Sequence, residues 1–515
     1  MNVISPRERH PLVRYPWRIP DGDSPNQGND FFAHYLFGFV GTAMIALWAH
    51  IAVVVPNPDA TLYLRAAELF VGGEWAGGFE VYRWPFYSLL VAGMMWSTTL
   101  DALSAAQVTN FIIDFGIVAS IITFARVLSR GNFVLVSTAT FFAVFHPQLT
   151  EFSSLIIRDH GYVLFFLLSV TICVADTKSP SVTKKLGLGI AVMAATAFRI
   201  EGLFLGLSIL FYYALIALRE PSLRGFAIAG FIGLTGFLLP ILFGVWVSGT
   251  LTKWMHGDFS ISLDLLSDAI ANRISALNTY VLFAGSNDGA HAYLSLSIGL
   301  AFFGMLRALT VPFAIIGIFA YFPQRYVSKA ESLPLFWFSL SQIPMLVLFT
   351  FVSAFLAWRY AMGFALIAMF PAIYCVAESF RELRRRRPRA YVIFPLLVFT
   401  VIGTWFADIP KYHRHGHIRE AATWLQQEIP SEARLWMNEP IIAYFAGRDY
   451  RRVLGVNQLM GYAPPATVDP KDVDYFVYSS IQRLGTGALP DGFIEKRKTL
   501  ARFQDKEGNF VVIFQ

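Results

Sequence analysis

Residues 34–55, HYLFGFVGTAMIALWAHIAVVV, contain no aspartate, glutamate, lysine or arginine. The hydrocarbon core of a membrane is about 30 Å thick, and a helix needs about 20 apolar residues to cross it. This segment is long enough to cross, and it begins too late in the chain for a cleaved signal peptide. We therefore interpret it as a retained first span that follows a cytoplasmic N-terminal segment, residues 1–33.

Apolar segments of this kind recur over most of the chain. The sequence is 55% hydrophobic and only 15% charged, whereas soluble proteins are about 25% charged, so a water-soluble protein is excluded. The predicted fold is mainly α: a polytopic transmembrane helical bundle within residues 34–407. We expect about eleven spans, near 34–55, 107–128, 132–147, 161–177, 186–198, 200–218, 225–247, 297–322, 333–355, 360–379 and 390–407.

The positions of the basic residues predict the topology. Cytoplasmic loops are enriched in lysine and arginine, and the basic clusters share one side if the apolar block 84–100 dips into the outer leaflet without crossing it. The outer loops are then 56–106, 148–160 and 248–296. The net charge of +6 is explained by this topology, so the expected partner is the lipid bilayer and not a nucleic acid.

The composition changes at residue 408. From there to the C-terminus 27 of 108 residues are charged, against 49 of the 407 before. A helix-like run, HIREAATWLQQEI, precedes short strand-like runs, ARLWMN, VDYFVYSS and NFVVIFQ. Residues 408–515 are therefore predicted to form a small soluble α/β domain outside the cytoplasm.

The first outer loop contains PNPDATLYLRAAELFVGG, residues 56–73. Asn57 can cap a helix whose first position is Pro58 and whose first turn holds Asp59. Gly72 and Gly73 then end it. At about 100° per residue, Asp59 lies on the face opposite Arg65, toward the apolar bundle. The simpler interpretation of Asp59 is a helix-start carboxylate with no other role.

This loop resembles the membrane glycosyltransferases of the GT-C type, which include the protein O-mannosyltransferases and the aminoarabinose-to-lipid A transferases. The resemblance rests on an acidic residue followed by Y-x-x-x-A, a Gly-Gly stop, a tyrosine and W-P-x-Y. The matching residues are Asp59, Tyr63, Ala67, Gly72, Gly73, Tyr82, Trp84, Pro85 and Tyr87. It is good over about the first two hundred residues and looser beyond them.

The resemblance implies an enzyme that takes a sugar from a polyprenyl-phosphate donor and transfers it, with inversion, to an extracytoplasmic acceptor. Asp59 would be the general base. Many relatives carry a second acid directly after the first, but Ala60 stands here, which weakens the case for a metal-binding acidic pair. No cofactor is identified with certainty, and a divalent metal remains an option.

Other candidate site residues lie in the outer segments. Asp159 matches a second acidic residue of the family and would share the catalytic role, although an ordinary loop charge is the alternative. Arg199 interrupts an apolar run, where an arginine is costly unless it is paired or functional. It would bind the leaving phosphate or pair with Glu201 or Asp159. The remaining substrate-binding candidates are Tyr63, Tyr82, Arg83, Arg158, Glu201, Arg359 and Tyr360.

Three histidines, His413, His415 and His417, follow the last expected span. Alternate residues of an extended strand share a face, so these three are weak candidates for zinc ligands.

Two other functions stay open. One is a lipid-linked glycan polymerase or ligase, and the other is a secondary transporter or a non-catalytic membrane protein. The leading interpretation places the chain in a bacterial inner membrane, with its active site and C-terminal domain on the periplasmic side.

Overall fold

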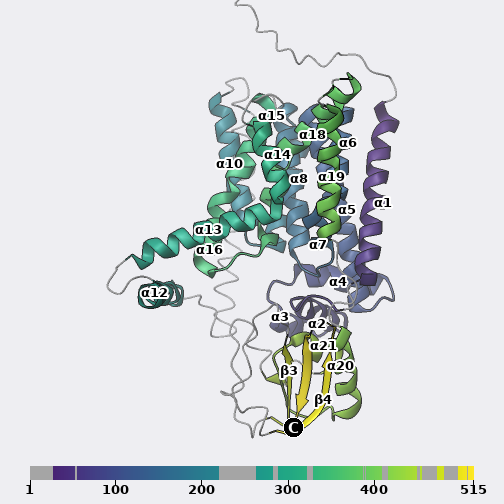
Figure 1. Cartoon of the computed structure of the whole chain (residues 1–515), viewed down its shortest axis with the longest axis vertical. Coiled ribbons are helices and arrows are strands. Elements are labelled where there is room, and N and C mark those ends of the chain that lie inside the picture. Colours follow the sequence, from purple (N-terminus) through teal and green to yellow (C-terminus); the bar gives the residue numbers. More distant parts are fainter. Residues whose placement is uncertain are drawn as a thin grey trace, which may run out of the picture.

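The computed structural model describes residues 27–52, 55–219, 225, 263–281, 288–321, 329–386, 388, 390–408, 416–448, 453–454, 473–480, 497–506 and 508–515. Most of this chain is helical. Long helices run side by side through the upper part of Figure 1, and a small sheet lies below one end of them.

The first half of the bundle contains six helices that are apolar over most of their surface. They are α1 (Gln27–Ala52), α5 (Ala102–Ser129), α6 (Phe133–Val144), α8 (Asp159–Lys178), α9 (Val182–Phe198) and α10 (Gly202–Arg219). The side chain of Asp101 caps α5 by accepting a hydrogen bond from the Ser104 amide at 2.7 Å. Near the other end of α5, the ammonium of Lys178 donates to the carbonyl of Leu128 at 3.0 Å, which places the C-terminal ends of α5 and α8 together.

Four short helices lie at the opposite end of these spans. In the first outer loop they are α2 (Ala60–Val71), α3 (Trp75–Val81) and α4 (Phe86–Ser97), and α7 (Pro147–Ser153) precedes α8. The predicted stop after α2 is confirmed, since the helix ends at Val71 and Gly73 has a φ of +80°. With 12 residues, α4 is shorter than the about 20 residues that crossing requires, as expected of a segment that only dips into the bilayer.

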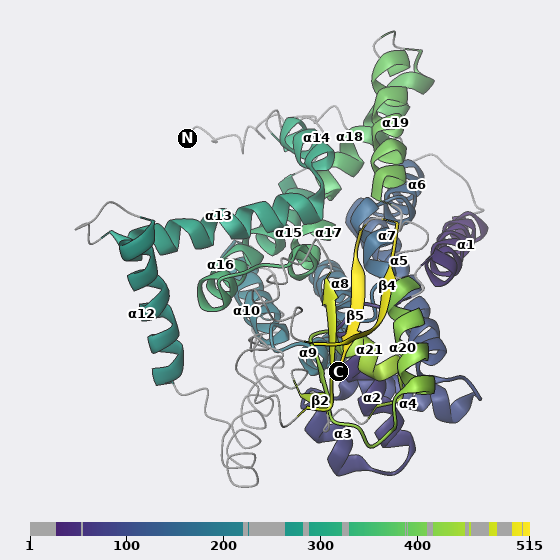
Figure 2. The ribbon, with the colours of Figure 1, turned by 60° about the horizontal axis from the view of Figure 1, so that its bottom comes forward.

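The second half contains α12 (Leu263–Tyr280), α13 (Gly289–Leu309), α14 (Val311–Tyr321), α15 (Lys329–Leu340), α16 (Gln342–Ser353), the 3-10 turn η2 (Trp358–Ala361), α17 (Met362–Ala368), α18 (Phe370–Arg384) and α19 (Ala390–Asp408). Figures 1 and 2 show that α13 runs across the direction of α5 and α8. Its last turn lies near α7, where Arg307 is 3.9 Å from Glu151.

The expected count of about eleven spans is not confirmed. Within the described residues, six helices are long and apolar enough to cross, or up to eight if each of two bent pairs is one span. The expected span 297–322 is broken at Thr310, which has a φ of +67°, and α13 begins inside the expected outer loop 248–296. Most of the expected span 225–247 lies outside the described residues.

The predicted α/β character of the C-terminal region is confirmed. A five-stranded sheet has the order β2-β1-β3-β5-β4, with parallel pairs on the β1 side and antiparallel pairs around β5. Its strands are β1 (Leu435–Met437), β2 (Val453–Leu454), β3 (Tyr475–Ser480), β4 (Thr499–Gln504) and β5 (Phe510–Phe514). Two helices, α20 (Gly416–Glu428) and α21 (Pro440–Phe445), pack with them.

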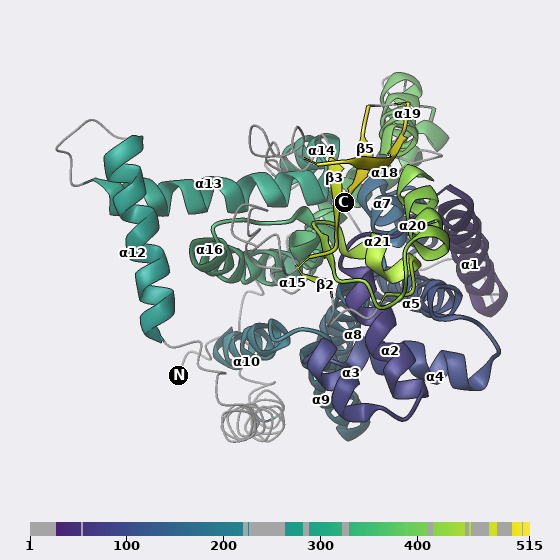
Figure 3. The ribbon, with the colours of Figure 1, turned by 90° about the horizontal axis from the view of Figure 1, so that it is seen from below.

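The C-terminal region contacts the first outer loop directly, as Figure 3 shows from below. Val55, just before α2, is buried in the same apolar cluster as Ile418 of α20 and Ile442 of α21. The hydroxyl of Tyr444 on α21 donates to Glu68 on α2 at 2.8 Å. The helix that follows Asp59 is therefore held from outside by the C-terminal region.

Candidate active site

Asp59 lies at the start of α2, at the end of the bundle next to the C-terminal sheet. It is the N-cap residue, but its side chain makes no capping hydrogen bond. The helix begins at Ala60, later than predicted, and Asn57 does not cap it, because its side chain binds the backbone of Ile156. The Asp59 carboxylate is not used for capping, and its Oδ2 instead accepts a hydrogen bond from Nη2 of Arg359 at 2.7 Å.

Asp159 lies at the start of α8 and is buried. α8 packs closely against the end of α9, since a Cβ at Gly161 would collide with the ring of Phe198. This packing brings Asp159 near Arg199. The guanidinium of Arg199 donates to the Asp159 carboxylate. Oδ2 of Asp159 is also 3.8 Å from Nε of Arg359. Asp159 thus contacts both Arg199, which was expected to bind the leaving phosphate, and Arg359, which was expected to bind the substrate.

The chain turns between α9 and α10 at residues 199–201, as the sequence predicted. Gly202 makes this turn possible, since a Cβ there would lie 2.4 Å from the backbone nitrogen of Thr196. Arg199 is buried in the turn and pairs with Glu201, with 3.1 Å between Nε and Oε2. Burial alone would lower the pKa of Arg199, but the carboxylates of Asp159 and Glu201 outweigh it and raise the pKa. Arg199 therefore pairs with Asp159 and Glu201, which was the structural alternative to phosphate binding.

Tyr360 lies between the two arginines. The guanidinium of Arg199 is 4.2 Å from the centre of its ring, and that of Arg359 is 5.4 Å away. An arginine over an aromatic face gains a favourable electrostatic contact. η2 thus contributes both a cation and an aromatic platform. One continuous chain of ion pairs, which we call the acid–arginine chain, joins residues 59, 359, 159, 199 and 201.

Arg158 lies beside this chain without a carboxylate partner among the described residues. Its guanidinium is 5.7 Å from the ring centre of Tyr82 and 5.9 Å from that of Trp84. Trp84 Nε1 and the hydroxyl of Tyr162 are buried hydrogen-bond donors that have no partner in the described part of the chain. Donors without acceptors favour an anionic or oxygen-rich ligand.

Tyr63 and Tyr82 form the wall next to Arg158. Their ring centres are 4.8 Å apart in an edge-to-face arrangement. Burial raises the pKa of both hydroxyls, of Tyr63 most. Both are therefore neutral near pH 7 and offer hydrogen bonds without charge.

Two groups of predicted residues lie apart from this cluster. The side chain of Arg83 is exposed, and it is not one of the five residues of the acid–arginine chain. His417 is buried in the C-terminal region, 3.4 Å from Oδ2 of Asp505, while His413 and His415 lie outside the described residues. Within those residues no three histidine, cysteine or acidic side chains are grouped to hold a metal ion.

Several residues of the site were not predicted from the sequence. Asp114, on α5, is buried and pairs with His160, which follows Asp159 in the chain. An ionisable residue inside an apolar helix is a signal of function by itself, and Asp114 carried that signal. Tyr162 carried none, because a tyrosine in an apolar helix is ordinary.

The chain matches no protein-family model and no curated protein. Its fold is similar to solved structures of membrane transferases. ArnT from Cupriavidus metallidurans bound to undecaprenyl phosphate has a TM-score of 0.53 and 13% identity, over 93% of this chain and 97% of that one. The apo state of the same protein has a TM-score of 0.53 and 12% identity, over 94% and 98%.

An oligosaccharyltransferase from Archaeoglobus fulgidus, in complex with zinc and sulfate, is also similar. Its TM-score is 0.50 and its identity 12%, over 85% of this chain and 68% of that one. These likenesses confirm the predicted resemblance to the GT-C fold.

Proposed function

We propose that this chain is an integral membrane glycosyltransferase that transfers a sugar from a polyprenyl-phosphate donor to an acceptor outside the cytoplasm. The acceptor is a lipid, a glycan or a protein. One observation carries the proposal: the partly exposed carboxylate of Asp59 is bonded to Arg359, and Arg158, which directly precedes Asp159 of the same acid–arginine chain, has no carboxylate partner among the described residues. A base next to cations is what transfer from a phosphate leaving group requires.

The three carboxylates of the site differ in exposure, and this difference supports a different role for each. The side chain of Asp59 is 43% exposed, whereas those of Asp159 and Glu201 are 5% and 12% exposed. An acceptor hydroxyl can approach only the first. Asp59 is therefore our general base, and Asp159 holds Arg199 and Arg359 in place.

The proposed reaction is a single inverting displacement. Asp59 takes the proton of the acceptor hydroxyl, the acceptor oxygen forms a bond to the anomeric carbon, and the bond from that carbon to the phosphate oxygen breaks. The leaving phosphate takes the bonding electrons. Arg158 and Arg359 would hold it, because guanidinium groups pair with phosphate oxygens in a planar fork.

Fixed partners limit which cations can serve. Arg199 is bonded to two carboxylates and its side chain is only 7% exposed, so we give it a structural role and transfer the phosphate-binding role to Arg158. Arg359 also contacts two carboxylates, but one of them is 3.8 Å away and its side chain is 21% exposed, so it keeps its role. Tyr82 and Trp84 flank Arg158 and offer aromatic faces for the sugar or the first isoprene units of the donor.

We place this site on the periplasmic side of a bacterial inner membrane. The basic residues at helix ends, Arg126, Lys178, Lys184, Lys185, Arg219, Arg381 and Arg384, lie at the C-terminal ends of α5, α8, α10 and α18 and the N-terminal end of α9. The acid–arginine chain lies at the opposite ends of α8, α9 and α10. The positive-inside rule makes the basic end cytoplasmic.

The test is transfer of radiolabelled sugar from a panel of synthetic polyprenyl-phosphate sugars to envelope acceptors by the purified protein. We expect activity with one donor and a loss of at least about 100-fold in Asp59→Asn, with donor binding retained. Asp101→Asn is the matched control, because this helix cap is also at the outer end and an asparagine still caps.

Undiminished transfer in Asp59→Asn would remove Asp59 from the mechanism and leave Asp159 as the base. Absence of transfer from every donor would overturn the proposal and direct the next experiments to transport.

A further inference from the structure

The backbone of Leu155 and Ile156, between α7 and α8, is held by side chains from other elements. Oδ1 of Asn57 accepts a hydrogen bond from the Ile156 amide at 2.7 Å, and its Nδ2 donates to the Ile156 carbonyl at 3.3 Å. One side chain thus pairs with both backbone groups of one residue, as a neighbouring strand would.

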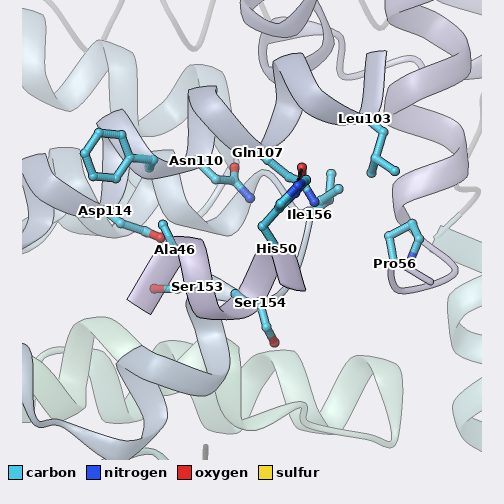
Figure 4. A pocket seen from close by; sticks show the side chains of 12 residues that line it. Ala46, His50, Pro56, Leu103, Gln107, Asn110, Asp114, Ser153, Ser154 and Ile156 are labelled. Carbon is cyan, nitrogen blue, oxygen red and sulfur yellow. Dashed lines mark hydrogen bonds between the residues drawn. The ribbon is translucent and has the colours of Figure 1, made fainter. Parts of the chain in front are cut away.

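The carbonyl of Leu155, one residue earlier, accepts two hydrogen bonds. Nδ2 of Asn110 donates to it at 2.8 Å, and Nε2 of His160 lies 3.0 Å from it. Oδ1 of Asn110 in turn accepts from the hydroxyl of Tyr87 at 2.8 Å. Figure 4 shows Asn110, Asp114 and Ile156 around the same cavity.

His160 and Asp114 complete this arrangement. Nδ1 of His160 is 2.5 Å from Oδ1 of Asp114, and the imidazole stacks on Phe152 with 4.0 Å between the ring centres. A carbonyl only accepts hydrogen bonds, so Nε2 must carry a proton. The ring is thus bound at both nitrogens and cannot rotate without breaking a buried hydrogen bond.

We infer that Asn57, Asn110, Asp114 and His160 form a positioning network that fixes the starts of α2 and α8 relative to each other. This inference rests on the proposed function. Asn57 lies two residues before Asp59, and the fixed backbone of Leu155 and Ile156 precedes Asp159, which His160 follows. The network therefore grips the backbone on both sides of Asp159 and close to Asp59.

These are positioning residues rather than catalytic ones. Each acts through the backbone or through another member of the network: Asn57 on Ile156, Asn110 and His160 on Leu155, and Asp114 on His160. Their effect on rate follows from geometry, since misplacing a catalytic group by 1 Å costs about 100-fold. A base carried by a helix start depends on how firmly that start is held.

The test compares Asn57→Ala and Asp114→Leu with wild type in the full-length protein in detergent. We expect kcat to fall by about 10- to 100-fold, with KM for the lipid-linked donor within about threefold of wild type. Hydrogen exchange in a peptide covering residues 154–160 should rise in both variants, because each loses a bond that holds this segment.

Two further variants separate positioning from general loss of structure. Asn132→Ala removes a matched asparagine that caps α6, at the other end of the bundle, and should leave kcat and the exchange of 154–160 unchanged. Asp114→Asn should keep most of the activity, since an amide can donate to Nδ1 of His160.

The inference is overturned if kcat of Asn57→Ala and Asp114→Leu stays within about twofold of wild type, if Asn132→Ala loses as much, or if Asp114→Asn is as impaired as Asp114→Leu. A wild-type protein that transfers from no donor defeats the proposed function and this inference with it. Active wild type with unaffected variants defeats the inference alone.

Discussion

Arg158 differs from the other arginines of the site in having no carboxylate partner among the described residues, and this gives the first prediction. Substituting it with methionine keeps the unbranched apolar stem of the side chain and removes the charge. We expect KM for the lipid-linked donor to rise by about tenfold, because one charge-assisted contact with phosphate is worth about 1.5–3 kcal/mol. The melting temperature should stay near that of wild type.

Steady-state kinetics over a range of donor concentrations would measure this effect. Arg307→Met is the control. Arg307 is also an arginine at this end of the bundle, but it has a carboxylate, Glu151, 3.9 Å away, and we give it no role in binding phosphate. An unchanged KM in Arg158→Met would move the phosphate to Arg359.

Arg199 gives a contrasting prediction about stability. It is buried between two carboxylates, so Arg199→Met leaves two buried negative charges without a partner. Breaking a buried pair in this way costs about 3–5 kcal/mol. We expect a large drop in the melting temperature, measured by differential scanning fluorimetry in detergent, and a smaller drop in Arg199→Lys. Equal stability with lost donor binding would instead give Arg199 the phosphate role.

Glu439 predicts a pH dependence of stability in the C-terminal region. Burial raises its pKa to about 7, although a hydrogen bond from the Ile441 amide opposes this. Its Oε1 has no partner among the described residues. The folded state therefore binds a proton that the unfolded state, with a pKa near 4.3, releases. Stability is full below about pH 4 and is lost as the pH rises to about 7, by about 4 kcal/mol in total.

Glu439→Gln should remove this dependence. The melting temperatures of the variant and the wild type should be close at pH 5 and differ most above pH 8, with the variant higher. Glu420→Gln, an exposed residue of α20, is the control and should have little effect at any pH. A constant difference between wild type and Glu439→Gln across this range would contradict the prediction.

At the scale of elements, the contact between α21 and α2 predicts that the C-terminal region steadies the helix that follows Asp59. Tyr444→Phe removes the hydrogen bond to Glu68, which costs about 0.5–1.5 kcal/mol. We expect faster hydrogen exchange in a peptide covering residues 60–71. Tyr280→Phe, at a tyrosine that is 84% exposed, is the control and should leave the exchange of residues 60–71 unchanged. Unchanged exchange in Tyr444→Phe would contradict the prediction and make the contact between α21 and α2 incidental.

Elements that depend on local signals were predicted well. The end of α2 at Gly72–Gly73, the turn at Arg199, helix α20 and strands β1, β3 and β5 all follow from capping, charge or alternation over a few residues. The direction of α13 did not, because hydropathy reports the composition of a helix and not its angle to its neighbours. One span was expected at 297–322, but the chain there forms the end of α13 and α14 with a break at Thr310, and α13 runs across the direction of α5 and α8.

Contacts between distant residues set the limit for the site. Asp59 and Arg359 are 300 positions apart, so both were candidates from the sequence, but nothing in it said that they pair. The same holds for Arg199, whose two interpretations depended on whether Asp159 lay within reach. Asn57 was expected to cap a helix because capping rules consider only neighbouring residues. Its actual partner, Ile156, is 99 residues away.

At the scale of the whole molecule, the proposed function requires the acid–arginine chain and the C-terminal region to face away from the cytoplasm. This predicts the labelling of single cysteines in intact cells by a membrane-impermeant maleimide. Glu420→Cys, exposed on α20, should react at once, whereas Arg385→Cys, exposed after α18, should react only after the cells are opened. Cys173 is buried, and Cys375 is replaced by alanine to lower the background.

Protease digestion of an epitope at the N-terminus, combined with the labelling of Arg385→Cys, decides whether α4 crosses the membrane. If α4 only dips into the outer leaflet, an epitope at the N-terminus lies on the side of Arg385 and is protected from protease in intact cells. If α4 crosses, the epitope is digested while Arg385→Cys stays protected, and the basic N-terminus then lies opposite the later basic clusters. Because the positive-inside rule disfavours that arrangement, we expect protection of the epitope. Labelling of Arg385→Cys in intact cells would reverse the orientation, and a base at Asp59 would then meet cytoplasmic rather than periplasmic acceptors.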